Sequence, residues 1–178
     1  MRRLTVTLFF IFLSSLTVLA QQPCKPYGPA GSILSFCPPA GMTVKKEPGD
    51  LHAGFLKVSP DGKDAVVLVI NESQVDISLG EFGYEMISSA YEDASFTDTT
   101  LITIGEYPTA NGLRGLRLVF LAETARKGST VKDKVERIFY LYEGPKGAKV
   151  FFNALFPSAD TTAETLIDNA MKTIKIKK

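Results

Sequence analysis

The sequence predicts a single α+β domain, an α/β/α sandwich in which a mostly antiparallel sheet lies between helices. Three observations predict this fold class. Two segments far apart in the chain carry helix caps followed by apolar side chains at helical spacing. Short strand-like segments alternate with turns that contain glycine and proline, which is typical of antiparallel sheets. One of these strands is apolar on both faces, and such a strand is usually covered on both sides.

The two helices are predicted from their caps. Ser78-Leu79-Gly80-Glu81 matches the capping box, in which the serine accepts a hydrogen bond from the first turn and the glutamate reaches back. The apolar spacing after it predicts a helix over 79–94. The second helix is expected to begin at Asp160 or Thr161, with Glu164 at the capping-box position and one apolar stripe packed on the sheet.

The strands are predicted from apolar runs and from the turns between them. The expected strand segments are 33–36, 41–44, 55–58, 65–70, 101–107, 113–121, 131–142 and 149–156. Ser59-Pro60-Asp61-Gly62 and the Asn-Gly pair in 108–112 are strong turn signals, and Gly144-Pro145-Lys146-Gly147 joins the last two strands. Segment 65–70 is the one that is apolar on both faces, so we expect layers on both sides of it.

The N-terminus reads as a secretory signal peptide over residues 1–20. Met1-Arg2-Arg3 is basic, 4–19 is uncharged and largely apolar, and Ala20 is a small residue at the cleavage position. A retained membrane span would need about 20 strongly apolar residues, and this run contains several Ser and Thr. A lipid anchor at Cys24 is the less favoured alternative. We therefore expect a secreted or periplasmic protein with no transmembrane segment after cleavage.

The net charge argues against a nucleic-acid partner. Removing Arg2 and Arg3 from the 20 basic residues leaves 18, against 19 acidic residues. Proteins that bind nucleic acid normally need clustered Lys and Arg. The C-terminal lysines Lys172, Lys175, Lys177 and Lys178 form the only basic run, and we interpret it as a solvated, fraying end.

The two cysteines, Cys24 and Cys37, are expected to form a disulfide, as cysteine pairs usually do in an oxidising compartment. A zinc site needs about four ligands, more than one histidine and two cysteines supply, so neither a metal nor a cofactor is predicted. Residues 21–32 are rich in proline and glycine and are expected to be a linker. The globular domain is expected over 33–178.

The order of these elements resembles the PsbP-like fold family. The resemblance covers 33–178 and depends on Ile33–Met42, with its Phe-Cys-Pro-Pro-Ala-Gly-Met opening, on Ser78–Phe82 and on Thr161–Ile176, which leads into a short terminal strand. It implies an antiparallel sheet between helices, and a binding or accessory role in place of catalysis. It implies no ligand residues, and a shared fold does not transfer a function by itself.

The sequence offers few catalytic candidates. His52 is the single histidine and lies in an expected loop, where most histidines are solvated. The carboxylate pairs Glu81 with Glu85 and Glu92 with Asp93 are more typical of a solvated helix face than of a metal site. An extracytoplasmic hydrolase or other enzyme that uses His52 or these carboxylates stays open as the alternative function.

Arg117, Arg137 and Tyr140 are the predicted binding residues. They lie within expected strands, and arginine and tyrosine are common interface anchors. We expect them on one exposed face of the sheet. The competing interpretation is that the arginines pair with Glu123 and Glu136 and stabilise the sheet surface.

The function predicted from the sequence is an exported, non-enzymatic accessory or binding module. Its partner would be a protein or a small molecule of the cell envelope. A structural component of an envelope complex is a third possibility.

Overall fold

The structure, a computed structural model, describes residues 24–28, 31–46, 53–62, 64–109, 111–125 and 130–177. Its elements in chain order are β1 (Leu34–Ser35), β2 (Thr43–Lys46), β3 (Ala53–Val58), β4 (Ala65–Gln74), α1 (Leu79–Glu92), β5 (Thr97–Glu106), β6 (Gly115–Ala125), β7 (Lys132–Glu143), the short 3-10 helix η1 (Pro145–Gly147), β8 (Ala148–Pro157), α2 (Thr161–Met171) and β9 (Lys175–Ile176).

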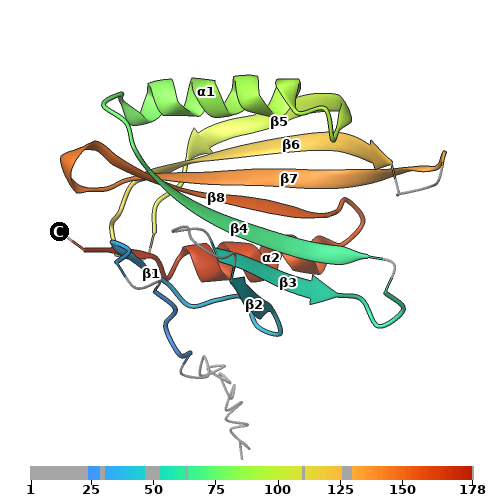
Figure 1. The fold of residues 1–178 in the computed structure, drawn as a ribbon, viewed down its shortest axis with the longest axis horizontal. Coiled ribbons are helices and arrows are strands. Elements are labelled where there is room, and N and C mark those ends of the chain that lie inside the picture. The colour runs from blue at the N-terminus through green and yellow to red at the C-terminus, as the bar shows by residue number, and fades with distance from the viewer. Residues whose placement is uncertain are drawn as a thin grey trace, which may run out of the picture.

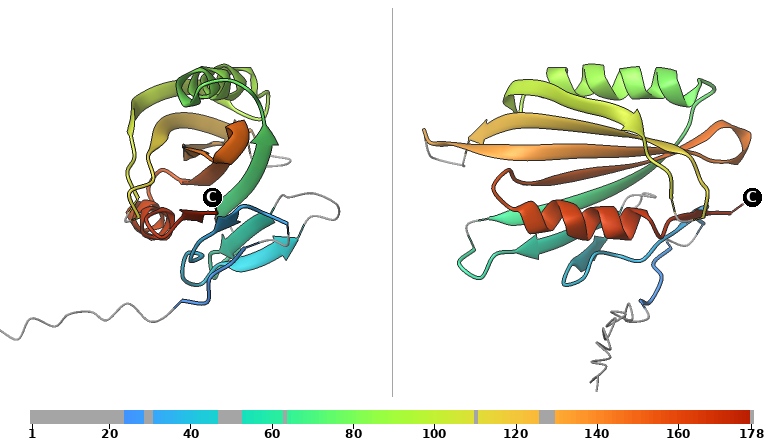
Figure 2. Two further views of the ribbon diagram at one scale, coloured as in Figure 1. Left: turned by 90° about the vertical axis from the view of Figure 1, so that its left-hand side faces the viewer. Right: turned by 180° about the vertical axis from the view of Figure 1, so that it is seen from behind.

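Seven strands form one antiparallel sheet, and the two helices lie on opposite faces of it. The strand order is β2-β3-β4-β8-β7-β6-β5, while β1 and β9 form a separate two-stranded sheet. Figure 1 shows α1 above the sheet and α2 below it, and the end-on view in Figure 2 shows the sheet curving between them. The predicted α+β sandwich is therefore confirmed.

The predicted hairpins are present because their turn residues adopt the backbone that the turns require. Gly62 (φ +71°) lies between β3 and β4, and Gly112 (φ +72°) lies between β5 and β6. Both glycines are in the left-handed region, where a side chain is disfavoured. Long strands on either side extend a few residues beyond the predicted bounds.

The helix caps explain where each helix begins. Ser78 and Glu81 form the predicted capping box at α1. At α2 the cap is Asp160, whose side chain accepts hydrogen bonds from the backbone of Thr162 and Ala163. Glu164 is therefore one position beyond the capping-box position, and its side chain binds Arg117 instead of the helix N-terminus.

The sheet separates two apolar cores. The larger core lies on the α2 face and contains edge-to-face contacts among Phe36, Phe55 and Phe152. The smaller core lies beneath α1, which contacts β5, β6 and β7. Because α1 does not extend over β4, only one side of that strand is fully buried. The buried positions are Val66, Leu68 and Ile70, and the half-buried positions are Ala65, Val67 and Val69. The expectation that 65–70 is covered on both sides is wrong for the second side.

The described part of the expected linker is attached to the domain. The backbones of Tyr27 and Phe36 exchange two hydrogen bonds, and the Tyr27 ring packs on Phe55. Ser32 is buried and bonds the Glu72 side chain. The expected signal peptide, residues 1–20, lies outside the described residues, so it stays a prediction, as do the domain bounds. In the described parts of the chain, neither helix has the length and apolar character that crossing a membrane would take.

Candidate functional site

The three predicted binding residues do not share one exposed face. Arg117 and Tyr140 lie on the α2 side of the sheet, and Tyr140 is fully buried. Arg137 lies on the α1 side, stacked beside Phe139, and is 8% exposed. The expectation of a single exposed surface is therefore wrong. Successive side chains of a strand point to opposite faces, and Arg137 lies three positions before Tyr140 in β7, whereas Arg117 is paired directly with Tyr140 across β6 and β7. A partner-binding role for these residues stays a prediction.

Arg117 and Tyr140 belong to a set of bonded polar groups beneath the middle of α2, which we call the α2-centre network: Arg117, Glu164, Asp168, Tyr140 and Tyr107. The Arg117 guanidinium binds Glu164, and its Nε lies 3.5 Å from Asp168 Oδ1. The Tyr140 hydroxyl donates to the Asp168 carboxylate, while the Tyr107 hydroxyl donates to the Asp168 backbone oxygen at 3.0 Å.

The titration behaviour of the network follows from burial and from these partners. Burial is the main cause that raises the pKa of Tyr140, and the Asp168 carboxylate raises it further. Burial alone would lower the pKa of Arg117, but Tyr140, Asp168 and Glu164 outweigh it, so the pKa of Arg117 is raised. The tyrosine stays protonated and the arginine stays charged. Apart from the buried Arg117 Nε, which has no hydrogen-bond partner among the described residues, these groups are bonded to one another, which favours a structural role.

Tyr142, next to the network, is a contrasting case. Its side chain is fully buried, yet no hydrogen bond reaches its hydroxyl from the described residues. Burial, followed by the nearby Tyr107 and Asp168, raises its pKa. The hydroxyl therefore lies in the core without a compensating partner, which is unfavourable.

Arg137 forms a second bonded site on the α1 face. Its Nη1 lies 3.0 Å from Asp93 Oδ2, at the end of α1, and its Nε donates to Asn153 at 3.3 Å. The guanidinium carbon lies 4.9 Å from the centre of the Phe96 ring. Burial lowers the pKa of Arg137, and the opposing effect of the Asp93 charge and hydrogen bond, which would raise it, is smaller.

The carboxylates expected to pair with the arginines have other environments. Glu123 lies 3.3 Å from Lys132 Nζ on the neighbouring strand. Burial, and next the charge of Glu164, raise the pKa of Glu136. The real partners of Arg117 come from α2 and that of Arg137 from the end of α1, so the predicted pairing with Glu123 and Glu136 is wrong.

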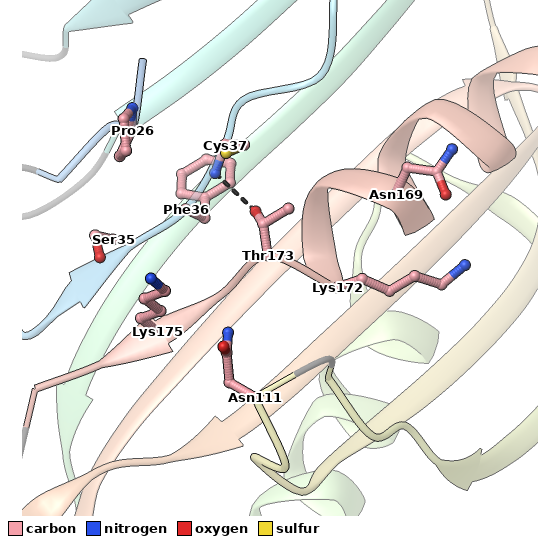
Figure 3. A pocket seen from close by; sticks show the side chains of 9 residues that line it. All are labelled: Pro26, Ser35, Phe36, Cys37, Asn111, Asn169, Lys172, Thr173 and Lys175. Atoms are coloured by element: carbon pink, nitrogen blue, oxygen red, sulfur yellow. Dashed lines mark hydrogen bonds between the residues drawn. The ribbon is translucent and has the colours of Figure 1, made fainter. Parts of the chain in front are cut away.

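A pocket of about 460 Å³ opens at the C-terminal end of α2. We call it the α2-end pocket. Its lining residues are Pro26, Ser35, Phe36, Cys37, Asn111, Asn169, Lys172, Thr173 and Lys175. Figure 3 shows their side chains arranged around Thr173. The volume is within the range of about 300–1,000 Å³ that small-molecule sites occupy.

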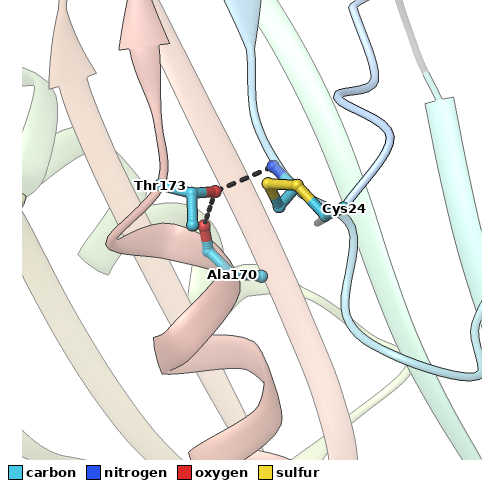
Figure 4. Close-up of a disulfide and its surroundings, with 4 residues drawn as sticks. Cys24, Ala170 and Thr173 are labelled. Carbon is cyan, nitrogen blue, oxygen red and sulfur yellow. Dashed lines mark hydrogen bonds between the residues drawn. A yellow bond between two sulfur atoms is a disulfide. The ribbon is translucent and has the colours of Figure 1, made fainter. Parts of the chain in front are cut away.

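Separate segments of the chain build the α2-end pocket and are fastened together there. The predicted Cys24–Cys37 disulfide is present, with the two Cα atoms 5.8 Å apart, and it holds the N-terminal segment that carries Pro26. The Cys37 amide donates to Thr173 Oγ1 at 2.8 Å, and that hydroxyl donates to the Ala170 carbonyl at 2.6 Å (Figure 4). Asn111, from the β5–β6 turn, donates to the Ile174 carbonyl at 2.9 Å.

Several polar side chains around this pocket have no bonding partner among the residues that the structure describes. Within the described residues, no side-chain hydrogen bond or ion pair engages Ser35, Asn169, Lys172 or Lys175. The lining contains two lysines and no acidic residue. Two of the C-terminal lysines, expected at a fraying end, have backbone partners: Lys175 pairs with Ser35 in the β1–β9 sheet, and the Lys177 amide donates to the Ile33 carbonyl at 2.7 Å.

The structure describes only some of the residues of the enzyme alternative. His52 lies outside the described residues. Glu81 is committed to the α1 cap, and Glu85 lines a shallow surface depression with Glu92 and Asp93. No group of potential metal ligands occurs in the parts of the chain that the structure describes.

Comparison with known proteins identifies the fold. No protein-family model matches the sequence, and neither does any curated protein. The structure is similar to that of CyanoP, the cyanobacterial PsbP of Synechocystis sp., with a TM-score of 0.58 over 92% of this chain and 98% of CyanoP, at 14% sequence identity. The chain has the PsbP-like fold. The resemblance in the sequence is thereby confirmed at the level of the fold.

A second PsbP-like structure supports the same conclusion. PA94 of Pseudomonas aeruginosa, a protein of unknown function, has a TM-score of 0.51 over 78% of this chain and 99% of its own, at 14% identity. At this identity the likeness shows the fold alone.

Proposed function

We propose that the protein is an exported, non-enzymatic binding module whose ligand site is the α2-end pocket. The observation that carries the proposal is the set of polar side chains around this pocket that no described residue engages in a hydrogen bond or ion pair. Ser35, Asn169, Lys172 and Lys175 are available to a ligand, whereas the charged groups of the α2-centre network are bonded to one another.

Two further features support the proposal. The Cys24–Cys37 disulfide suits an oxidising compartment, as does the basic and apolar N-terminal sequence. The disulfide also fixes one wall of the pocket, which limits the conformational freedom lost when a ligand binds. Neither feature requires catalysis.

The test is to find what the pocket holds after export. The full chain is expressed with its own N-terminal segment, purified from the exported fraction, and analysed by native mass spectrometry. We expect a mature chain that begins at Gln21, contains no free thiol, and retains a non-covalent small molecule or partner.

A blocking variant assigns the retained species to the pocket. Ser35→Phe places an aromatic ring among the lining residues, while Ser89→Phe places the same ring on the exposed surface of α1. We expect Ser35→Phe to lose the retained species and Ser89→Phe to keep it, with both proteins folded by circular dichroism. Equal retention by the two variants would show that the species binds elsewhere and would refute the proposal.

A further inference from the structure

We infer that the protein forms a two-fold dimer in which the free edge of β5 pairs with the same strand of a second copy. The surface involved, which we call the β5 edge, consists of Ile102, Ile104 and Glu106 on the strand and of Tyr84 and Tyr91 on α1. It shares no residue with the lining of the α2-end pocket, so the dimer goes beyond the proposed function.

The two edges of the seven-stranded sheet differ in their protection against another strand. The strand order ends at β2 on one side and at β5 on the other, and no described strand pairs with the outer side of either. β2 is four residues long and contains two lysines, features that protect natural edge strands. β5 is ten residues long and contains no lysine, arginine or proline. Its register irregularities lie before Thr103, so the segment from Thr103 to Glu106 is a regular strand with an open edge.

The backbone groups available to a second strand follow from the β5–β6 ladder. The Tyr107 amide donates to the carbonyl of Gly115, which lies directly opposite, at 2.8 Å. Because the bonding direction alternates along an antiparallel pair, Gly105 faces β6, whereas Ile104 and Glu106 turn their N–H and C=O groups outward. No described residue bonds these outward groups. An extended chain can therefore add to this edge without disturbing the β5–β6 pairing.

Two tyrosines of α1 lie along the same edge. The Leu101 amide donates to the Tyr91 hydroxyl at 3.2 Å, which fixes one point of contact between α1 and β5. The two elements run side by side in opposite directions (Figures 1 and 2). Tyr84 lies two helical turns, about 11 Å, before Tyr91. Ile104 lies three strand residues, about 10 Å, after Leu101. Tyr84 is therefore at the level of Ile104, on the β5 side of α1.

Exposed apolar side chains gather at this edge. Of the seven large apolar side chains that are exposed in the described residues, four belong to α1 and β5: Tyr84 (74% exposed), Ile102 (54%), Tyr91 (53%) and Ile104 (51%). A complete aromatic side chain buries about 150–250 Å² in an interface, so the two tyrosines present about 250 Å² per copy. With the isoleucines and the strand backbone, the β5 edge presents about half of the roughly 800 Å² that each partner of a standard interface buries. This area fits a weak dimer that dissociates on dilution.

A second copy of β5 supplies the chemistry that this edge requires. It is extended, its outward backbone groups are free, and it carries isoleucines at alternate positions. When Ile104 lies opposite its counterpart on a two-fold axis, Glu106 lies opposite Ile102 of the second copy. No like charges are then directly opposite each other, an arrangement that would be destabilising. Both α1 helices lie on the same face of the joined sheet, and a two-fold contact uses the same patch on each copy and closes.

Sedimentation velocity of the mature protein tests the dimer between about 5 and about 500 µM, a range that brackets weak association. We expect a shift from monomer to dimer as the concentration rises. Ile104→Lys places two like charges opposite each other at the two-fold axis and should raise the dissociation constant about tenfold. Val44→Lys is the matched control, because it adds the same charge to β2, at the opposite edge, where the valine is 44% exposed. It should leave the dissociation constant unchanged.

Hydrogen exchange gives a second measurement that needs no variant. The amides of Ile104 and Glu106 should exchange with deuterium more slowly as the protein concentration rises. Because these amides point away from β6, pairing at the open edge is what protects them. The exchange measurement therefore decides the matter even if Ile104→Lys does not fold.

Three results would overturn the dimer. They are a monomer at every concentration, an association that Val44→Lys weakens as much as Ile104→Lys, and exchange at Ile104 and Glu106 that does not depend on concentration. Protection of these amides only in a complex with a different exported protein would assign the edge to a foreign strand and would overturn it as well. None of these outcomes involves the α2-end pocket, so the proposed function is tested separately.

Discussion

The middle and the end of α2 use similar side chains for opposite purposes. In the middle, Glu164 and Asp168 bind Arg117, and the whole network lies against the sheet. At the end, Lys172 and Lys175 line an open pocket, and neither side chain has a partner within the described ranges. The difference teaches that the type of a side chain is a weak guide to its role. Its bonding state and its access to solvent distinguish a group that holds the fold from one that can hold a ligand.

Removing the disulfide should have the largest effect on the end region. Cys24 and Cys37 close a loop with a sequence separation of 13, for which the chain-entropy model gives about 3 kcal/mol of stability. Cys24→Ser/Cys37→Ser should lower the free energy of unfolding by about that amount in urea. It should also retain less of the species bound in the pocket, because the segment with Pro26 is then held only through Tyr27. Full retention in the double variant would show that the pocket wall does not depend on the disulfide.

Arg117→Ala should have the next largest effect, in the middle region. Removing one partner of a fully buried ion pair costs about 3–5 kcal/mol, and since the Arg117 side chain is 19% exposed we expect about 2–3 kcal/mol. Lys172→Ala is the matched control and should leave the urea midpoint unchanged, because no described residue forms a hydrogen bond or ion pair with that side chain. Similar midpoints for the two variants would contradict the division of roles along α2.

Two buried tyrosines test the same distinction through a single atom, the hydroxyl oxygen, which is hydrogen-bonded in one and not in the other. Tyr140 and Tyr142 are both fully buried, but in the described part of the chain only the Tyr140 hydroxyl has a hydrogen-bond partner. Tyr140→Phe should cost about 1–2 kcal/mol, and Tyr142→Phe should be neutral or stabilising because it removes an unsatisfied hydroxyl. Thermal unfolding of the two variants measures the difference. A larger cost for Tyr142→Phe would mean that its hydroxyl has a partner in the folded protein.

The ion pair on the α1 face should give the smallest effect, and it depends on pH. Burial would raise the pKa of Asp93, but hydrogen bonds from Ser95 and the charge of Arg137 outweigh it, so the pKa is lowered. The stabilisation is therefore present above the usual aspartate pKa and is lost as the pH falls through the folded-state value.

Asp93→Asn should consequently lower stability at neutral pH, by about 1 kcal/mol or less for this partly exposed pair. It should also flatten the loss of stability between about pH 5 and pH 2. Urea unfolding across that range checks both effects. An unchanged pH slope would show that Asp93 does not contribute to acid sensitivity.

Local signals in the sequence predicted most of the fold, because their partners are a few residues away. The Ser78–Glu81 cap and the glycine turns at Gly62 and Gly112 are of this kind. The partner of Arg117 lies 47 residues away on another element, and no local pattern indicates it. The sequence also did not predict that one side of β4 is only half-buried. Tertiary packing decides which strands α1 covers, and these are β5, β6 and β7.

The candidate site was harder to predict than the fold. The α2-end pocket is built where the N-terminal segment, β1, the β5–β6 turn, α2 and β9 meet, and its Asn, Thr, Ser and Lys residues match no motif. The disulfide, the Asn-Gly turn and the C-terminal lysines were each visible in the sequence. Their common location depends on the β1–β9 pairing, which joins the two ends of the domain.

The most direct measurement compares ligand occupancy when each region is changed separately. Native mass spectrometry is applied to exported Tyr140→Phe and to exported Lys172→Gln/Lys175→Gln, alongside the unaltered protein. We expect Tyr140→Phe to retain the bound species despite its lower stability. The double lysine variant should lose that species while its stability is unchanged. Loss in Tyr140→Phe together with retention in the double variant would contradict the account and would place the binding function in the α2-centre network.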